Sequence, residues 1–256
     1  MDFFSITERN NLEGPPLRVV AEELQKFEGA LVIQVSGNSK IDKRLINNQK
    51  ITKIFVVGKN LFLQFGKFTL RIHFLMFGSY RINEEKVGGS PRVSLVSSKG
   101  VLNFYNTAIR LLSIEEATAL YDEEVDILSE KWKINKVIQL ASQSPNSLIC
   151  DVLLDQNVFA GVGNIIKNEA LFMSKIHPLS ITGKIPKQQL VSLVKDARQF
   201  SILFYETVKK DQSLRSRLLI YGKRNCPLCG KKNKIQKTGK LRRISYFCES
   251  TQQLFI

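Results

Sequence analysis

Three of the four cysteines in this 256-residue chain stand near its C-terminus, at a spacing that suits a metal ion. Two residues separate Cys226 from Cys229, and Cys248 follows. Two Cys-x2-Cys pairs at this spacing would form a zinc ribbon, but Thr251 occupies the fourth position, and threonine is a poor zinc ligand. Two alternatives stay open: zinc held by three cysteines with water or a remote ligand, or a ribbon that folds by packing without a metal.

A carboxylate stands immediately before the first predicted helix, in the sequence Glu13-Gly14-Pro15. The positive end of a helix dipole favours a charged acid there, which suits a catalytic carboxylate. The commoner role of such an acid is to cap the helix. The residues alone leave both roles open.

The stretch over residues 155–172, DQNVFAGVGNIIKNEALF, organises the second half of the chain. Gly161 and Gly163 allow a tight turn, and a helix is predicted to begin near Asn164. Unpaired amides and the dipole at a helix N-terminus attract anions, and the Asn164 side chain adds a donor. The net charge of +15 indicates a nucleic-acid phosphate as that anion. The alternative is an ordinary corner in a helical bundle.

Three further side chains in the first half could contact a ligand. Lys59 follows Gly58 in a turn between two predicted strands, where a lysine is usually solvated. His73 and Met76 lie in the apolar run LRIHFLMFG, where a lone histidine is usually a core or edge residue and a methionine usually fills the core. None of the three indicates chemistry by itself.

The elements that must position these residues change along the chain. Residues 1–11 are polar and are expected to form an extension outside the fold. A short amphipathic helix is predicted from Pro15 to the stop at Gly29. Residues 30–110 hold six or more short apolar runs, which predict an antiparallel two-layer β-sandwich. Two of these runs, LVIQV and LFLQF, show little alternation, which predicts strands buried on both faces.

The second half reads as helical. A short helix is predicted over residues 114–121, and helical periodicity over 135–156 and 187–210 surrounds the glycine turn. Cys150 lies in an apolar part of this region and is expected in the core. The expected organisation is an extension (1–11), a β-sandwich domain (12–130), a helical domain (131–221) and a C-terminal hairpin (222–256).

The basic charge is concentrated at the C-terminal end. Residues 221–256 contain nine lysines or arginines against one acid, Glu249, so they carry +8 of the +15. Such a patch usually binds a polyanion through salt-sensitive phosphate contacts. The alternative is a solubilising tail, but Ile244, Tyr246 and Phe247 predict that the segment folds.

No targeting or membrane segment is evident in the sequence. No apolar run approaches the roughly 18 residues that span a bilayer. The first residues lack the basic and apolar regions of a secretory signal. Four cysteines in a chain of this size do not make a disulfide framework. An intracellular protein is therefore expected.

Four stretches together resemble the formamidopyrimidine-DNA glycosylase/endonuclease VIII family of base-excision repair enzymes. LEGPP resembles the family's N-terminal PEGP, LRIHFLMFG its LRIHLGM strand, and DQNVFAGVGNIIKNEALF its helix–two-turn–helix; CPLC with RRISYFC resembles its C-terminal finger. They occur in the family's order, from residue 12 to residue 252. The resemblance implies an α+β multidomain fold: an N-terminal two-layer β-sandwich with a flanking helix, a helix–two-turn–helix domain and a zinc-finger-like β-hairpin.

The resemblance also implies an activity, the excision of oxidised bases from damaged DNA by base flipping. Glu13 matches the acid that assists cleavage of the N-glycosidic bond and opening of the sugar ring. Lys59 matches the sandwich lysine that contacts phosphate near the lesion, and it is expected with Glu13 among the catalytic residues. Its amine could in principle attack the sugar, but a charged lysine paired with phosphate is a poor nucleophile. Cys226, Cys229 and Cys248 match the zinc ligands of the finger.

Five residues match DNA contacts of the family. His73 matches a phosphate contact on the strand, and Met76 the wedge that fills the space left by the flipped base. Gly163 and Asn164 match the grip on phosphates flanking the lesion. Arg243 matches the finger arginine that clamps the target phosphates.

One departure concerns the nucleophile. The family uses the α-amine of an N-terminal proline, but here Leu12 stands at that position with eleven residues ahead of it. Its nitrogen is an amide and cannot form a Schiff base, unless proteolysis after Asn11 frees a primary amine. The resemblance therefore leaves AP-lyase activity open. The alternative to a glycosylase is a catalytically silent protein that binds damaged DNA or abasic sites.

Two departures concern the DNA duplex. Leu75 replaces the glycine of the family's HLGM, and LNFYNTAIRLL shows no counterpart of a further intercalating pair. Weaker hold on the opposite base would favour single-stranded DNA, where flipping costs less. The expected partner is thus damaged DNA, double- or single-stranded, bound by a monomer. The expected location is the nucleus of a eukaryote or the nucleoid of a bacterium.

Overall fold

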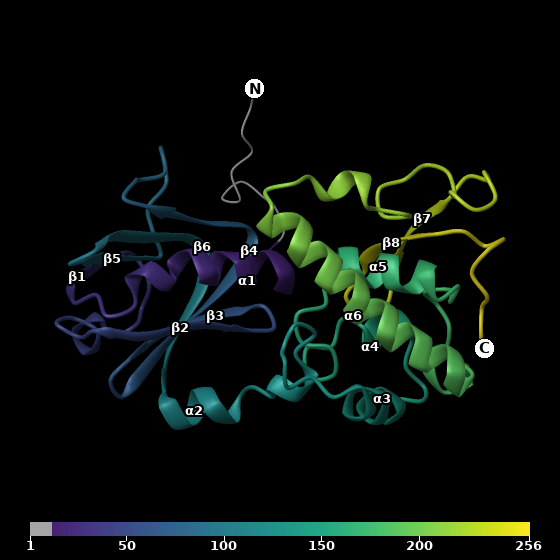
Figure 1. The fold of residues 1–256 in the computed structure, drawn as a ribbon, viewed down its shortest axis with the longest axis horizontal. Helices are drawn as coiled ribbons and strands as arrows, with labels where there is room; N and C mark the ends of the chain where they lie inside the picture. The colour runs from purple at the N-terminus through teal and green to yellow at the C-terminus, as the bar shows by residue number, and fades with distance from the viewer. Residues whose placement is uncertain (1–11) are drawn as a thin grey trace. The chain divides into compact units, whose positions relative to one another are not determined.

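A computed structural model describes residues 12–256, which divide into two compact units (Figure 1). The first unit contains Leu12 and Pro16–Tyr121, and the second contains Glu13–Pro15 and Asp122–Ile256. The extension predicted over residues 1–11 lies outside the described residues, and the four-part division of the chain stays a prediction. None of the helices in the described residues has the length and apolar character needed to cross a membrane.

The first unit is built on a sheet of six strands: β1 (Val32–Ser36), β2 (Ile51–Val57), β3 (Asn60–Phe65), β4 (Phe68–Ile82), β5 (Val93–Ser97) and β6 (Gly100–Ser113). They pair in the order β1-β5-β6-β4-β3-β2, and each pair is antiparallel. The long strands β4 and β6 lie at the centre. The two strand layers of the predicted sandwich are thus parts of one continuous hydrogen-bonded sheet.

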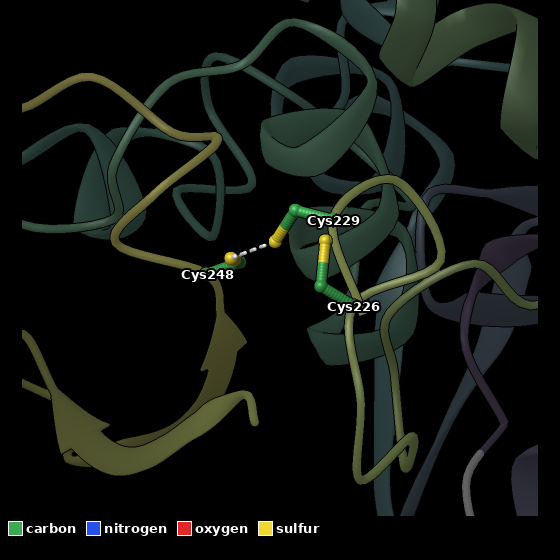
Figure 2. Close-up of side chains that lie close together, drawn as sticks. All are labelled: Cys226, Cys229 and Cys248. Atoms are coloured by element: carbon green, nitrogen blue, oxygen red, sulfur yellow. Dashed lines mark hydrogen bonds between the residues drawn. The ribbon is translucent and has the colours of Figure 1, made fainter. Parts of the chain in front are cut away.

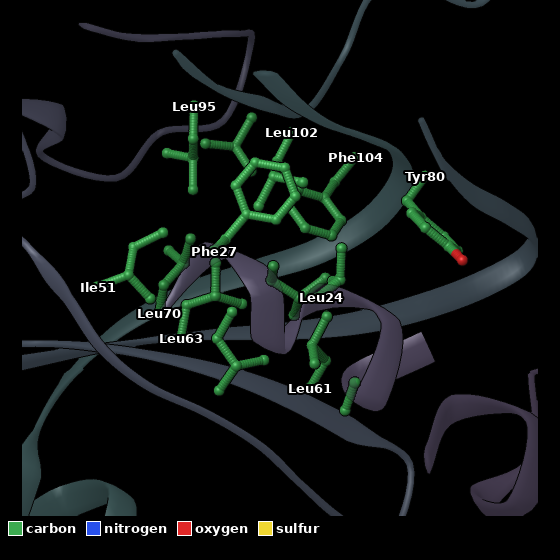
Figure 3. Close-up of a cluster of buried hydrophobic side chains, with 14 of the residues drawn as sticks. Leu24, Phe27, Ile51, Leu61, Leu63, Leu70, Tyr80, Leu95, Leu102 and Phe104 are labelled. Atoms are coloured by element: carbon green, nitrogen blue, oxygen red, sulfur yellow. The ribbon is translucent and has the colours of Figure 1, made fainter. Parts of the chain in front are cut away.

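Helix α1 (Gly14–Leu24) lies between the β1–β5 side and the β2–β3 side of this sheet (Figure 1). It continues as a 3-10 turn over Gln25–Phe27 and ends before Gly29, whose φ is +78°. Its apolar face fills the core, as the periodicity predicts, and Leu24 and Phe27 are buried. Figure 3 shows the strand residues that surround them: Leu95, Leu102 and Phe104 on one side, and Ile51, Leu61, Leu63 and Leu70 on the other.

The two strands predicted to be buried on both faces differ. All residues of β3 except Gln64 are buried, which confirms that prediction. The prediction for LVIQV is wrong: in β1 only Val32 is buried, and Ile33 is 55% exposed. The reason is position, because β1 is an edge strand with a neighbour on one side, and an apolar run does not reveal that.

The second unit is mainly helical. Its helices are α3 (Ile134–Ser142), α4 (Ile149–Val152), α5 (Asn164–Met173) and α6 (Lys187–Lys209), and its hairpin is β7 (Lys234–Thr238) with β8 (Arg243–Phe247). Helix α2 (Ile114–Ala119), in the first unit, and α6 confirm the helices predicted there. The helical region predicted over 135–156 is interrupted between α3 and α4, where Pro145 cannot continue a helix.

Helix α5 is the buried centre of the second unit. It packs against both α6 and β8, and nearly all of its residues are buried. Four of those buried residues are polar: Asn164, Lys167, Asn168 and Glu169. Buried polar groups are costly without hydrogen bonds, so the partners of these side chains determine how the unit is held together.

Candidate functional site

Glu13 caps the helix that carries the glycine turn, not the helix that follows it in sequence. Its Oε1 accepts a hydrogen bond from the Ile165 amide at 2.7 Å, and its Oε2 accepts one from the Ile166 amide at 3.4 Å. Both amides belong to the first turn of α5, and Glu13 is 2% exposed. Glu13 therefore does cap a helix, but the Ile165 amide that it accepts from lies 152 positions further along the chain.

Three glycines allow this close approach. The Gly14 amide donates to the Gly161 carbonyl at 3.0 Å, and a Cβ on Gly14 would lie 2.8 Å from the Gly161 Cα. Gly161 itself has a φ of +94°. Gly163 has an extended backbone, but a Cβ there would lie 2.3 Å from the Glu13 Cδ. The turn requires glycine at position 163 because the carboxylate fills that space.

The helix amides predicted to attract a phosphate thus hold the chain's own carboxylate. The predicted phosphate contacts at Gly163 and Asn164 lie just ahead of the two amides that Glu13 engages. The Asn164 side chain, predicted to add a donor for an anion, donates from Nδ2 to the Ile244 carbonyl of β8 at 3.0 Å. In this structure it links α5 to the hairpin.

Lys167 and Asn168 hold β8 on α5 in the same way. The Lys167 Nζ donates to the Ser245 Oγ at 2.8 Å. The Asn168 Oδ1 accepts a hydrogen bond from the Tyr246 amide at 2.7 Å. Three side chains of α5 converge on the Ile244 carbonyl, with donor distances of 3.0 to 3.3 Å. The backbone next to Arg243, the predicted phosphate clamp, is therefore fixed by α5.

Glu169 fixes the connection between α6 and the hairpin. Its carboxylate accepts hydrogen bonds from the successive amides of Leu219, Ile220 and Tyr221 at 2.8, 3.1 and 2.7 Å. Burial raises the pKa of Glu169, and these three donors oppose that shift. The carboxylate acts as a structural anchor for the segment that leads into the finger.

Lys167 is a buried lysine whose pKa is shifted by several charged groups of the second unit. It is fully buried, and burial lowers its pKa to about 8. The neighbouring Cys150 and Glu13 raise this pKa, and Arg243 lowers it. Cys150 is itself buried in α4, as predicted. The charges of Glu13 and Arg243, which come from opposite ends of the chain, thus act on one amine.

The sequence patterns did not single out Lys167, Asn168, Glu169 or Tyr221. The available signal was the polar triplet Lys-Asn-Glu inside an otherwise apolar helix. A polar run in a helix that is buried all round must find partners, and here the partners lie far along the chain.

Lys59 and His73 lie together in the first unit. The His73 Nδ1 is 3.0 Å from the Lys59 carbonyl oxygen and 3.2 Å from the Asn60 Oδ1. Because a carbonyl oxygen only accepts, Nδ1 carries a hydrogen, and in the neutral ring Nε2 is then an acceptor. Burial lowers the pKa of His73. The ring can donate to a phosphate only when it is protonated.

Met76 lies in a bulge of β4 and is 62% exposed. A core-filling role is therefore excluded for this side chain. The structure brings Glu13, Asn164 and Arg243 together in the second unit, while Lys59, His73 and Met76 belong to the first.

Cys226, Cys229 and Cys248 form a cluster in the finger (Figure 2). Their sulfur atoms all lie within 4.8 Å of one another, and the Cys229 and Cys248 sulfurs are 3.5 Å apart. Burial alone would raise the pKa of Cys226, but backbone donors at Leu228 and Cys229 bring it down to about 7. A thiol that ionises this readily is suited to bind a metal.

The donor set fits a zinc ion. Zinc–sulfur bonds of about 2.3 Å place neighbouring thiolates at the separations seen here. The Thr251 Oγ1 lies 3.8 Å from the Cys226 Sγ, and Thr251 occupies the fourth position of the sequence pattern. Three thiolates with a hydroxyl or a water at the fourth corner can therefore hold zinc.

Comparisons with known proteins show which proteins the chain is similar to. A family model described as the formamidopyrimidine-DNA glycosylase H2TH domain matches residues 112–216. Endonuclease 8-like 3 of Mus musculus is 37% identical over 253 residues, which covers 96% of this chain and 42% of that protein. Endonuclease 8-like 2 of Bos taurus is 34% identical, over 72% of this chain and 58% of that protein. The chain thus spans about half the length of these curated relatives.

Solved structures share the fold. The crystal structure of a viral DNA glycosylase has a TM-score of 0.82 and 24% identity, covering 94% of this chain and 100% of that one. Lactococcus lactis formamidopyrimidine-DNA glycosylase, non-covalently bound to DNA containing an AP site, has a TM-score of 0.82 and 22% identity, covering 94% and 99%.

The sheet-rich first unit, the turn before α5 and the cysteine-bearing hairpin define a helix–two-turn–helix protein of α+β fold. These structural features and the sequence relatives together identify the family. The chain belongs to the formamidopyrimidine-DNA glycosylase/endonuclease VIII family.

Proposed function

We propose that this chain is a DNA glycosylase of the endonuclease VIII-like type, which excises oxidised bases from damaged DNA. The observation that carries the proposal is the Glu13 carboxylate, buried against the glycine turn of α5. A carboxylate held in one orientation by two backbone donors suits general acid–base chemistry. The names of the relatives, which are endonuclease 8-like proteins, support the same activity.

In this mechanism the C1′–N bond of a flipped nucleotide breaks. Water adds to C1′, and the base leaves with the proton that balances the reaction. Glu13 assists the transfer of that proton and the opening of the sugar ring. Lys59 and His73 contact phosphate near the lesion, and Met76 fills the space of the flipped base. In the second unit, Gly163, Asn164 and Arg243 bind the flanking phosphates.

Zinc bound by Cys226, Cys229 and Cys248 would supply only structural support, by fixing the two ends of the hairpin. The backbone anchored by α5 holds Arg243 in place in either case. We propose that the protein acts as a monomer on double- or single-stranded DNA. Because the sequence relatives described above are animal proteins, a nuclear location is proposed and the bacterial nucleoid is set aside.

Lyase activity would need a free amine. The Leu12 nitrogen is an amide in this chain, and cleavage after Asn11 would expose it as a primary amine. A second candidate function follows from that amide: a protein that binds abasic sites without cleaving the strand. It would keep Asn164, Arg243 and the basic hairpin.

Excision assays on oligonucleotides with one oxidised base distinguish these functions. Base release by the full chain, lost in Glu13→Gln, is expected for a glycosylase. Borohydride trapping on abasic DNA, with intact-mass analysis of the protein, tests the lyase step. A trapped adduct on a chain beginning at Leu12 would assign the amine. Tight abasic-site binding with neither release nor an adduct would favour the binding protein.

A further inference from the structure

Two arginines lie directly opposite each other on the central strands of the first unit. Arg71 of β4 pairs across the sheet with Arg110 of β6. Arg71 is half-buried and Arg110 is exposed. Like charges at directly opposite positions destabilise a sheet. Neither guanidinium takes part in an ion pair within residues 12–256, so no carboxylate of the described chain offsets this repulsion.

The Asn60 side chain connects Arg71 to the predicted phosphate contact at His73. Its Oδ1 accepts a hydrogen bond from the Arg71 Nε at 2.9 Å and lies 3.2 Å from the His73 Nδ1. Asn60 is buried, so this oxygen holds both side chains from inside the sheet. The bond uses only the Nε donor of Arg71, and the donors on its two terminal nitrogens remain for other partners.

Tyr121 forms a third side of the same position. Its ring packs edge-on against Phe62, with ring centroids 4.8 Å apart, and Phe62 pairs with Arg71 from the neighbouring strand β3. Arg71 donates a hydrogen bond to the Tyr121 hydroxyl oxygen. Burial raises the pKa of Tyr121, although both arginines oppose this shift, so the hydroxyl keeps its hydrogen at neutral pH. Because its oxygen already accepts from Arg71, that hydrogen is available to a ligand.

His73 continues this row of donors along β4. Its side chain and that of Arg71 lie on one face of the strand, with a separation of about 7 Å along the backbone. The residue opposite His73 on β6 is Ala108, whose side chain is too small to cover the ring. Donors placed at intervals along one strand suit the phosphates of a nucleic-acid backbone, which such contacts position without reading the bases.

We propose that Arg71, Arg110 and Tyr121 form an anion subsite, which holds the DNA phosphate next to the one contacted by His73. The proposal rests on the proposed function and deepens it, because it adds a phosphate contact beyond those that the family resemblance implies. A bound phosphate offsets the repulsion between the two guanidinium groups. The arginine pair therefore weakens the free protein and strengthens its complex with DNA.

The test compares the full-length wild-type chain with Arg110→Glu. Glutamate opposite Arg71 forms a favourable cross-strand pair and competes with phosphate for the same guanidinium, so the free variant should melt at a higher temperature than wild type. Its affinity for a duplex with a tetrahydrofuran abasic analogue should fall by at least about tenfold. The slope of log affinity against log salt should fall by at least about one. Two duplexes of unrelated sequence should show the same loss.

Two further variants serve as controls. Arg44→Glu makes the same charge change at an exposed position of the first unit, so it measures the effect of net charge alone and should keep the wild-type salt slope. Tyr121→Phe keeps the ring against Phe62 and removes only the hydroxyl. Because the lost donor is neutral, it should weaken binding by a smaller factor than Arg110→Glu does and leave the salt slope unchanged.

Each alternative outcome is distinct. Wild-type affinity and salt slope in Arg110→Glu, with base excision retained by wild type, would overturn the subsite and leave the proposed function intact. Weaker binding with a lower melting temperature would assign Arg110 a structural role and also overturn it. If millimolar inorganic phosphate raised the melting temperature of wild type but not of Arg110→Glu, while both bound DNA equally, the site would take a free anion and not DNA. Neither binding nor excision by wild type would overturn both proposals.

Discussion

The Glu13 carboxylate accepts a hydrogen bond from the Ile165 amide at 2.7 Å, across 152 positions of sequence. This contact joins the proposed catalytic acid to the helix that anchors the finger. One side chain therefore has two separable roles: it completes the N-terminus of α5, and it stands where chemistry on DNA is proposed. The two roles predict different responses to the same substitutions.

Replacing Glu13 by Gln keeps an acceptor oxygen for the Ile165 amide but removes the charge. We expect a small loss of unfolding free energy, about 1 kcal/mol, because a neutral cap interacts less with the helix N-terminus. Base excision should fall by at least about 100-fold, because general acid–base assistance is lost. Denaturant unfolding and single-turnover excision measure the two effects.

Glu13→Ala separates the roles further. It removes both the cap and the catalytic group, so stability should fall more than in Glu13→Gln while excision falls by a similar factor. Excision by Glu13→Gln at the wild-type rate would contradict the catalytic role and leave only the cap.

Adding a methyl group at Gly163 should disturb the same contact from the other side. A Cβ there would lie 2.3 Å from the Glu13 Cδ, so the carboxylate must move off the helix amides. We expect Gly163→Ala to lower the unfolding free energy by about 1–3 kcal/mol, as overpacking does. Gly89→Ala is the matched control, because its Cβ would make only ordinary contacts at 3.6 Å. Equal stability of the two variants would show that the turn tolerates the displacement.

The elements of the fold were largely predictable because they depend on local pattern. The predicted apolar face after Pro15 corresponds to α1, and the predicted stop corresponds to Gly29, whose φ is positive. The long periodic stretch over 187–210 corresponds to α6. The edge position of β1 was not predictable, because an apolar run records hydrophobicity and not the number of neighbouring strands. Strand order depends on pairing between distant segments, which no local period encodes.

The sequence could predict which residue types form the candidate site, but it could not predict which of these residues contact one another. Glu13 stood out as an acid at a helix N-terminus, but the helix it caps is reached only through the fold. Lys167 could not be selected, because a lysine in a helix is usually solvated, and only its burial against Ser245 makes it unusual. The cysteine spacing, by contrast, did predict a cluster, since two of its three members are close in sequence.

The buried amine of Lys167 should make the unfolding free energy change with pH in the alkaline range. Its pKa is about 8 in the folded chain and near 10.5 when unfolded. Between these values the unfolded chain binds a proton that the folded chain has released, so the unfolding free energy rises with pH. Below pH 8 both states are protonated, and the penalty for burying the charge is fully present.

Lys167→Met removes this dependence. From pH 7.5 to pH 10.5, the unfolding free energy of wild type should rise relative to that of Lys167→Met by up to about 3 kcal/mol. Lys187→Met, at an exposed position in the first turn of α6, should follow wild type. A constant difference between wild type and Lys167→Met across this range would contradict a lowered pKa for Lys167.

The proposed phosphate contact of His73 should depend on pH in the opposite direction. Its Nδ1 hydrogen is engaged by the Lys59 carbonyl, so only the protonated ring can donate from Nε2. Burial lowers its pKa, so the donor is present at acidic pH and is lost as pH rises. From pH 7.5 to pH 5.5, at constant salt, wild type should gain about three- to tenfold more DNA affinity than His73→Gln. His177→Gln, at the other histidine of the chain, should keep the wild-type dependence.

Thr251 would limit how tightly the finger binds zinc. Its hydroxyl is 3.8 Å from the Cys226 Sγ, but a neutral hydroxyl binds zinc far more weakly than a thiolate. Thr251→Cys should therefore raise zinc affinity by at least about tenfold, since even residues outside the ligand set change metal affinity by 10- to 100-fold. Competition with a chromogenic chelator measures this, and Thr251→Ser, which keeps the hydroxyl, should match wild type. If zinc bound equally to all three proteins, the fourth ligand would have to come from elsewhere. If wild type bound none and Thr251→Cys did, the native hairpin would fold by packing alone.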